Sequence, residues 1–135
     1  MSSFLLSAQQ LVYTALTNGL PYTIFDDVPD LPIGMPEDSF PYIVLGHDYT
    51  NAFDTDSWVG VKVSVQLDIW SRYNGKKEVK TILGEIYELM HRKSFVTPGV
   101  AVVDCLHVYS TIPDTGASNY VHGISRYEIT LTEDL

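Results

Sequence analysis

Hydrophobic and polar positions alternate most regularly between residues 59 and 69. The odd positions are Val59, Val61, Val63, Val65, Leu67 and Ile69, and the even positions include Lys62, Ser64, Gln66 and Asp68. Successive side chains of a strand point to opposite faces, so this pattern predicts one long β-strand with one face in a core and the other toward water. A shift of one residue would bury Lys62 and Asp68, so the register of this strand should be strongly fixed.

Two other segments have helical periodicity. Ser3 can cap a helix over residues 3–18, which Asn18 and Gly19 would end. Phe4 and Leu11 widen its apolar face, so this helix should pack on a sheet and also touch something else, for which a neighbouring subunit is one candidate. The second helix begins after Asn74-Gly75. Its apolar stripe consists of Val79, Ile82, Leu83, Ile86, Tyr87, Leu89 and Met90.

The remaining strands are expected at residues 22–25, 41–49, 100–112 and 121–131. The strand at 41–49 and the long strand should form a hairpin, joined by residues 50–57. Residues 100–112 are rich in valine but alternate poorly, which predicts a strand that is buried on both faces or bulged. Together these elements predict a single α+β domain over residues 1–135, a sandwich in which two α-helices pack on an antiparallel β-sheet.

A proline-rich, acidic segment interrupts the pattern at residues 26–41. Four prolines in sixteen residues exclude a helix or a central strand, so this segment should be a loop. Loops of this length in compact domains are usually functional or disordered. Leu31, Ile33 and Met35 lie among its acids, as expected for a stiff docking arm. The alternative is a solvated loop whose apolar side chains fold back.

Charge is distributed unevenly along the 135 residues, whose net charge is −9. Eight acidic residues and no lysine or arginine precede Lys62. Such a surface repels a phosphate backbone, which argues against ordinary DNA binding. The chain has no apolar run of about 18 residues and no secretory signal pattern, so we expect a soluble protein made in the cytoplasm, without membrane contact. Cys105 is the single cysteine, which excludes an internal disulfide and favours a small buried side chain.

The sequence predicts no catalytic, cofactor-binding or metal-binding residues. Its four histidines are scattered, and Asp48, Asp54 and Asp56 lack the calcium-loop pattern. His47 with Asp48 and His107 could meet as a base and its orienting acid, but no serine or cysteine lies in a nucleophile motif and no glycine-rich phosphate loop is present. We therefore expect no enzyme. A small-ligand enzyme or binding module remains the competing class, and would need a deep pocket near His47 and His107.

Several segments, taken in order, resemble the tail completion or tail terminator proteins of long-tailed bacteriophages and of related prophage and gene-transfer particles. The matching stretches are the N-terminal helix, Phe25-Asp26-Asp27-Val28-Pro29, Pro41-Tyr42-Ile43-Val44-Leu45-Gly46, Leu67-Asp68-Ile69-Trp70-Ser71-Arg72, the amphipathic helix that follows, and Gly123-Ile124-Ser125-Arg126-Tyr127. The specificity lies in their order and spacing, and the resemblance covers nearly the whole chain.

The resemblance implies a structural virion protein that assembles as a hexameric ring on the head-proximal end of the tail tube. There it would stop tube polymerisation and join the tail to the neck of the capsid, with copies of itself, the tube protein and a neck or connector protein as partners. A closed ring needs two different contact surfaces on each subunit, so association saturates. The alternatives within this class are a neck or connector component and a tube subunit.

The acidic half of the chain suggests a further hypothesis about such a ring. Some of its acids would face the lumen, where a negative wall keeps passing DNA from adhering; alternatively they would meet a basic collar on the tube or neck protein. The candidate lumen or interface residues are Asp26, Asp27, Asp30, Leu31, Ile33, Met35, Glu37, Asp38, Asp54 and Asp56.

Overall fold

The computed structural model describes residues 4–26, 40–46, 49–52, 60–72, 75–93, 96–97, 100–113 and 120–133. These residues form two helices and a seven-stranded sheet. The elements in chain order are α1 (Phe4–Gly19), β1 (Thr23–Phe25), β2 (Tyr42–Leu45), β3 (Tyr49–Ala52), β4 (Gly60–Ser71), α2 (Lys77–Met90), β5 (Val96–Thr97), β6 (Val100–Thr111) and β7 (Val121–Glu133).

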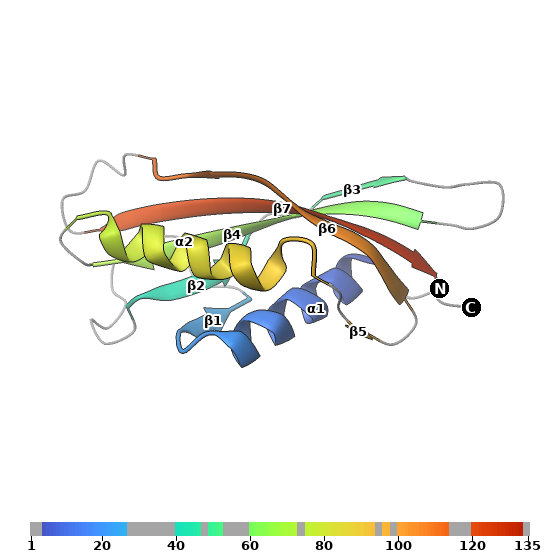
Figure 1. Ribbon diagram of the computed structural model, residues 1–135, viewed down its shortest axis with the longest axis horizontal. Coiled ribbons are helices and arrows are strands. Elements are labelled where there is room, and N and C mark those ends of the chain that lie inside the picture. The colour runs from blue at the N-terminus through green and yellow to red at the C-terminus, as the bar shows by residue number, and fades with distance from the viewer. Residues whose placement is uncertain are drawn as a thin grey trace.

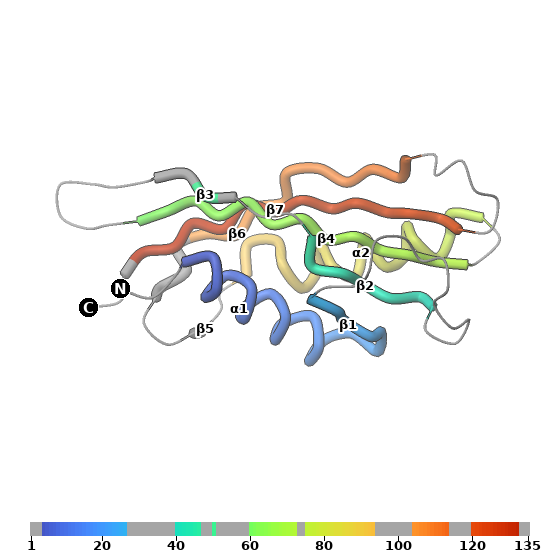
Figure 2. Tube along the Cα trace, turned by 180° about the vertical axis from the view of Figure 1, so that it is seen from behind, coloured from blue at the N-terminus to red at the C-terminus, as the bar shows by residue number. Residues whose placement is uncertain are grey.

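The sheet has the strand order β1-β2-β4-β7-β6-β5, and β3 pairs with β4 on the same edge as β2 (Figure 2). All pairs are antiparallel except β1 with β2, which is parallel. The predicted α+β class and the predicted hairpin of β2 with β4 are confirmed. Two details differ from the prediction: the β1–β2 pair is parallel, and residues 50–52, which were expected in the connection, form the short strand β3 together with Tyr49.

The long strand β4 has the two faces that its alternation predicts. Val63, Val65 and Ile69 are at most 3% exposed. Lys62 and Gln66, which point to the other face, remain partly exposed. Each β4 residue from Gly60 to Ser71 lies opposite a residue of β7, whose buried positions fall on the same face. One face of the two central strands therefore forms the sheet side of the hydrophobic core.

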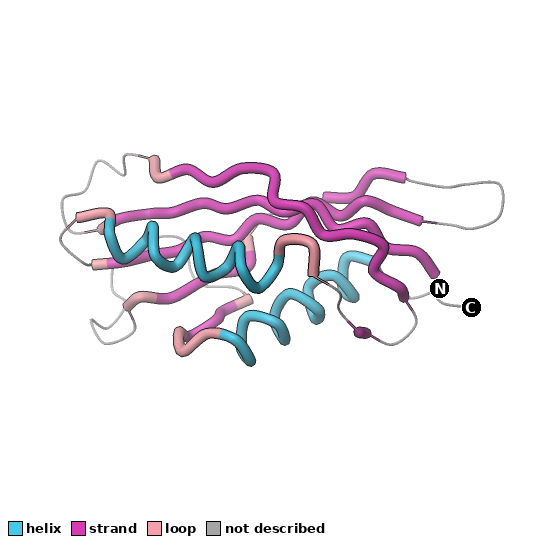
Figure 3. The backbone as a smooth tube through the Cα atoms, viewed as in Figure 1, coloured by secondary structure: helices cyan, strands magenta, loops and turns pink. Residues whose placement is uncertain are grey.

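Both helices cover this face. α1 and α2 run in opposite directions along one side of the sheet, so the molecule has a helical layer and a sheet layer (Figures 1 and 3). Neither helix is long and apolar enough to span a membrane. The core side chains that the helices contribute are Phe4, Ala8, Leu11, Val12 and Leu16 from α1, and Val79, Ile82, Ile86 and Met90 from α2.

The strand β6, which pairs with β5 only at Val100 and Ala101, is bulged, which was one of the two structures expected for it. Its register with β7 shifts between Val102 and Asp104 and again between His107 and Tyr109. Between the two bulges, the backbone nitrogen of Arg92 donates to the carbonyl oxygen of Cys105 at 2.7 Å. The end of α2 is thus tied directly to β6. Cys105 is buried as predicted, and burial raises the pKa of its thiol to about 12, so the thiol stays neutral.

Candidate functional site

The face of β4 and β7 opposite the helices carries most of the polar side chains of the sheet. It consists of the even-numbered positions of both strands, and those of β4 are the positions that the alternation predicts to face water. The two described helices both lie on the other face. Within the described residues, this face, which we call the open face, therefore brings polar side chains of two long strands together.

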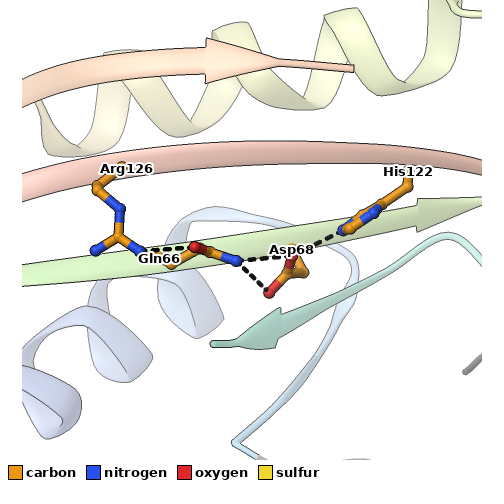
Figure 4. Close-up of polar contacts among 4 residues, drawn as sticks. All are labelled: Gln66, Asp68, His122 and Arg126. Carbon is orange, nitrogen blue, oxygen red and sulfur yellow. Dashed lines mark hydrogen bonds and ion pairs between the residues drawn. The ribbon is translucent and has the colours of Figure 1, made fainter. Parts of the chain in front are cut away.

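Five of these side chains, which we call the polar ladder, form a continuous hydrogen-bonded chain across the two strands, and Figure 4 shows four of them. They are Ser64, Gln66 and Asp68 of β4 and His122 and Arg126 of β7. Arg126 donates from Nη1 to the Ser64 hydroxyl at 2.7 Å and from Nη2 to the Gln66 carbonyl oxygen at 2.6 Å. The Gln66 amide in turn donates to both carboxylate oxygens of Asp68, at 3.2 and 3.3 Å.

At the His122 end, the polar ladder contacts aromatic side chains. His122 Nε2 lies 2.7 Å from Asp68 Oδ1, and its ring stacks on Trp70 with centroids 4.0 Å apart and planes 5° apart. Stacking and the hydrogen bond together fix the orientation of the imidazole. Beyond Trp70, the Arg72 guanidinium lies over the rings of Phe40 and Tyr120, 5.7 and 5.6 Å from their centroids.

Charges on this face are largely paired. At the other end of the ladder, Lys62 Nζ lies 3.7 Å from Glu128 Oε1, and both side chains are more than a third exposed, so the pair adds about 0–1 kcal/mol to stability. Arg126 and Asp68 are joined through Gln66. An acidic chain thus presents one broad face on which positive and negative groups are balanced.

The chemistry of the polar ladder suits positioning and recognition. His122 and Asp68 form a possible acid–base pair, but the only hydroxyl in the ladder, Ser64, accepts a hydrogen bond from a guanidinium, which does not make it a nucleophile. Within the described ranges, no three His, Cys, Asp or Glu side chains are grouped in a way that could hold a metal ion.

Large exposed hydrophobic side chains form two other candidate contact surfaces. Among the described residues they number six, and all lie on α1, on the C-terminal half of α2 or at the β6 bulge. They are Leu5, Leu6 and Tyr13 on α1, Tyr87 on α2, and Val108 and Tyr109 on β6. The prediction that α1 has apolar residues left over for a second contact is consistent with this exposure. However, Phe4 and Leu11, which had suggested the contact, are buried in the core.

Of the acidic and apolar residues proposed for a lumen or an interface, the described ranges contain Asp26. It is exposed and accepts a hydrogen bond from the Gln9 amide at 3.3 Å. The others, Asp27, Asp30, Leu31, Ile33, Met35, Glu37, Asp38, Asp54 and Asp56, lie outside the described residues. His47 and Asp48 lie outside them as well, so the proposed meeting of His47 with His107 stays a prediction.

His107 belongs to a separate cluster that joins β6 to the end of α2. Its backbone N–H donates to Nδ1 of His91 at 3.0 Å, and its ring contacts the rings of Tyr87 and Tyr127. Its Nε2 lies 2.8 Å from the Ser110 hydroxyl. Burial, followed by the nearby His91, lowers the pKa of His107 below its ordinary value.

This shift predicts that the protein loses stability as the pH falls below neutrality. In the unfolded chain the pKa of His107 returns to about 6.5, so the unfolded state binds a proton first and the free energy of unfolding falls through that pH. Urea unfolding of the wild type and of His107→Gln at pH 7.5 and pH 5.5 measures the effect. We expect the variant to lose less stability between the two pH values; an equal loss would contradict the assignment.

The comparisons with known proteins agree with this fold. The chain resembles a solved chain described as "Virion of native gene transfer agent (GTA) particle", with a TM-score of 0.80 over 99% of this chain and 100% of the other. At 13% sequence identity, that likeness shows the fold alone. No curated protein matches the chain by sequence.

Two helices on one side of a mostly antiparallel sheet, with an ordered polar face and no catalytic set among the described residues, are typical of a structural α+β protein. The family model "Tail completion protein gp17" matches residues 6–132, and the chain belongs to this family. The suspected resemblance is thereby confirmed. It is a structural family, so the expectation that the chain is not an enzyme is also confirmed.

The polar ladder could not be recognised as a unit from sequence, although the alternation along β4 correctly placed Ser64, Gln66 and Asp68 on the face opposite the core. The ladder forms because Gln66 lies directly opposite Arg126, and Trp70 opposite His122, in the β4–β7 register. The available signal was the matching length of the two alternating segments, each about twelve residues long and each with charged groups on its polar face.

Proposed function

We propose that this tail completion protein is a virion component that forms a hexameric ring at the head-proximal end of a tail tube. The ring ends tube growth and joins the tail to the neck of the capsid. Its partners are further copies of the chain, the tube protein and a neck or connector protein.

The family match over residues 6–132 carries this proposal, since completing a tail requires a subunit that binds its end and stops further addition. The fold likeness to a chain from a gene transfer agent virion supports it. The surfaces are also suitable. A balanced polar face and exposed apolar side chains on an acidic protein can be covered in an assembly, because they do not concentrate the like charge that would repel neighbouring copies.

The proposal also gives the acidic segments a role in the ring. We place some of Asp26, Asp27, Asp30, Glu37, Asp38, Asp54 and Asp56 on the wall of the lumen, with DNA passing close by without specific contact. Leu31, Ile33 and Met35 on the same segment would contact a neighbour. An imaged ring whose bore is neutral or basic, with these carboxylates on the outer rim, would overturn this part while leaving the ring itself intact.

The decisive experiment is assembly with the tube protein. The purified chain should elute as one discrete oligomer in size-exclusion chromatography with light scattering, and negative-stain images should show rings. Added to polymerising tube protein, it should cap tube ends and shorten the tubes in proportion to its concentration. Unlimited polymerisation of the chain itself would identify a tube subunit, and no effect on tube length would reject the terminator function.

A further inference from the structure

The large exposed apolar side chains of the described residues fall into two groups on different elements. We name the group on α1 the α1 patch (Leu5, Leu6, Tyr13) and the group beyond α2 the β6 patch (Tyr87, Val108, Tyr109). α1 contacts β1, the first strand in the sheet order, and also the short last strand β5, whereas the β6 patch lies at the second bulge of β6 and on α2 (Figure 1). The two patches therefore lie on different elements of the subunit, and no residue belongs to both.

The β6 patch is held in place by the histidine cluster. Val108 is the extra residue of the second bulge, between His107 and Tyr109, and is 52% exposed. The ring of Tyr87 stacks on His91 with centroids 4.6 Å apart and meets the edge of His107 at 5.5 Å. Bulges of this kind end regular pairing at a sheet edge, so this edge offers side chains for contact rather than a free backbone ladder.

The α1 patch borders a hollow of about 420 Å³ between α1 and β1. Leu6 and Tyr13 line it on the helix side, and Ile24 and Phe25 on the strand side. Leu6 is 53% exposed and Tyr13 42% exposed. Gln9, Gln10 and Asp26 complete the lining, so the hollow is about half polar and half apolar. Such a hollow beside protruding apolar side chains can receive an aromatic side chain with a polar group, such as a tyrosine, from another molecule.

The charges beside the two patches have opposite sign. Asp26, which is exposed, lines the hollow of the α1 patch. Arg92 and Lys93, both exposed, follow directly after His91 beside the β6 patch, against one exposed carboxylate, that of Glu88. Like patches would bring like charges together, whereas the α1 patch facing the β6 patch brings opposite charges together.

We propose that the α1 patch of one copy binds the β6 patch of the next copy, with Val108 and Tyr109 seated against the hollow beside Leu6. This contact is heterologous, so every subunit uses two different surfaces and a ring closes when the rotation per subunit allows it. The inference rests on the proposed ring function and specifies which surfaces form the ring.

Two single substitutions, one in each patch, test the contact without disturbing the core. Leu6→Glu and Val108→Glu each place a carboxylate on a side chain that is more than half exposed, so both variants should fold with wild-type circular dichroism. Each should reduce the discrete oligomer to monomer in size-exclusion chromatography with light scattering. Thr14→Glu is the matched control, since Thr14 is exposed on α1 about 80° around the helix from Leu6, and it should leave the oligomer intact.

Mixing the two variants distinguishes the proposed contact from a symmetric one. Leu6→Glu retains a wild-type β6 patch and Val108→Glu retains a wild-type α1 patch, so the mixture should form a heterodimer that cannot grow into a ring. If the contact instead joined like patches, one of the two variants alone would assemble as the wild type does, and that result would overturn the proposal.

The failures of the two proposals differ. A wild-type oligomer that persists in both Leu6→Glu and Val108→Glu overturns this contact and leaves the ring function standing. A wild-type chain that stays monomeric at every concentration, and does not cap tubes, overturns the ring function and this contact with it.

Discussion

Replacing Leu67 with alanine is expected to lower the free energy of unfolding by about 2–5 kcal/mol. Leu67 is fully buried on the face of β4 that the helices cover, at the centre of the strand. Truncation removes apolar burial and leaves a cavity that closely packed neighbours fill only in part. Guanidinium unfolding followed by circular dichroism, at one fixed protein concentration, measures the change.

Leu106→Ala is the matched control for this substitution. Leu106 lies on β6 opposite Glu128, a position of the open sheet face, and is only half-buried. Folding removes less apolar surface of this side chain from contact with water, so Leu106→Ala should lower the free energy of unfolding by about 1 kcal/mol or less. Equal losses at Leu67 and Leu106 would show that the open face is buried as deeply as the core face, contrary to the two-layer architecture.

The alternation along β4 and β7 could be predicted from sequence because it is a local property. Each apolar side chain at an odd position must reach the core, and a strand has only two faces. Bulges in β6 were also indicated, since its valines do not keep a period of two. Lengths of the two helices were predicted to within a few residues for the same reason, as each buries a stripe with helical spacing.

Apart from the pairing of β2 with β4, what could not be predicted was which strands are neighbours. In the chain, β4 and β7 are separated by α2, β5 and β6. No local pattern in either strand predicts that Asp68 will lie beside His122. The polar ladder depends on that pairing, so it could not be found from either strand alone. The parallel pairing of β1 with β2 has the same origin: three residues carry too little pattern to specify a partner.

The orientation of α1 shows a second limit. Its first turns are apolar on nearly every side, so the pattern does not decide which residues enter the core. In the structure Phe4 and Leu11 pack inward, while Leu5 and Leu6 remain exposed. The helix must also place its C-terminal end against α2, where Gly19 lies so close to Leu89 that a Cβ atom would be 2.6 Å from it. That tertiary contact helps fix the rotation of the helix.

The same substitution at two glycines should change stability in opposite directions. A Cβ atom on Gly123 of β7 would overlap with the side chain of Val79, because α2 packs directly against the strand there. Gly123→Ala must push α2 away from the sheet, and overpacking of this kind costs about 1–3 kcal/mol. The free energy of unfolding should fall by that amount in urea titrations.

Gly84 lies on the exposed side of α2, where a Cβ atom would have no neighbour within 4 Å. Alanine there restricts the unfolded chain and favours the helix, so Gly84→Ala should raise the free energy of unfolding by about 1 kcal/mol. A gain at Gly84 with a loss at Gly123 would establish that α2 is a regular helix seated against β7. A gain at both positions would mean that the helix packs farther from the sheet than the structure places it.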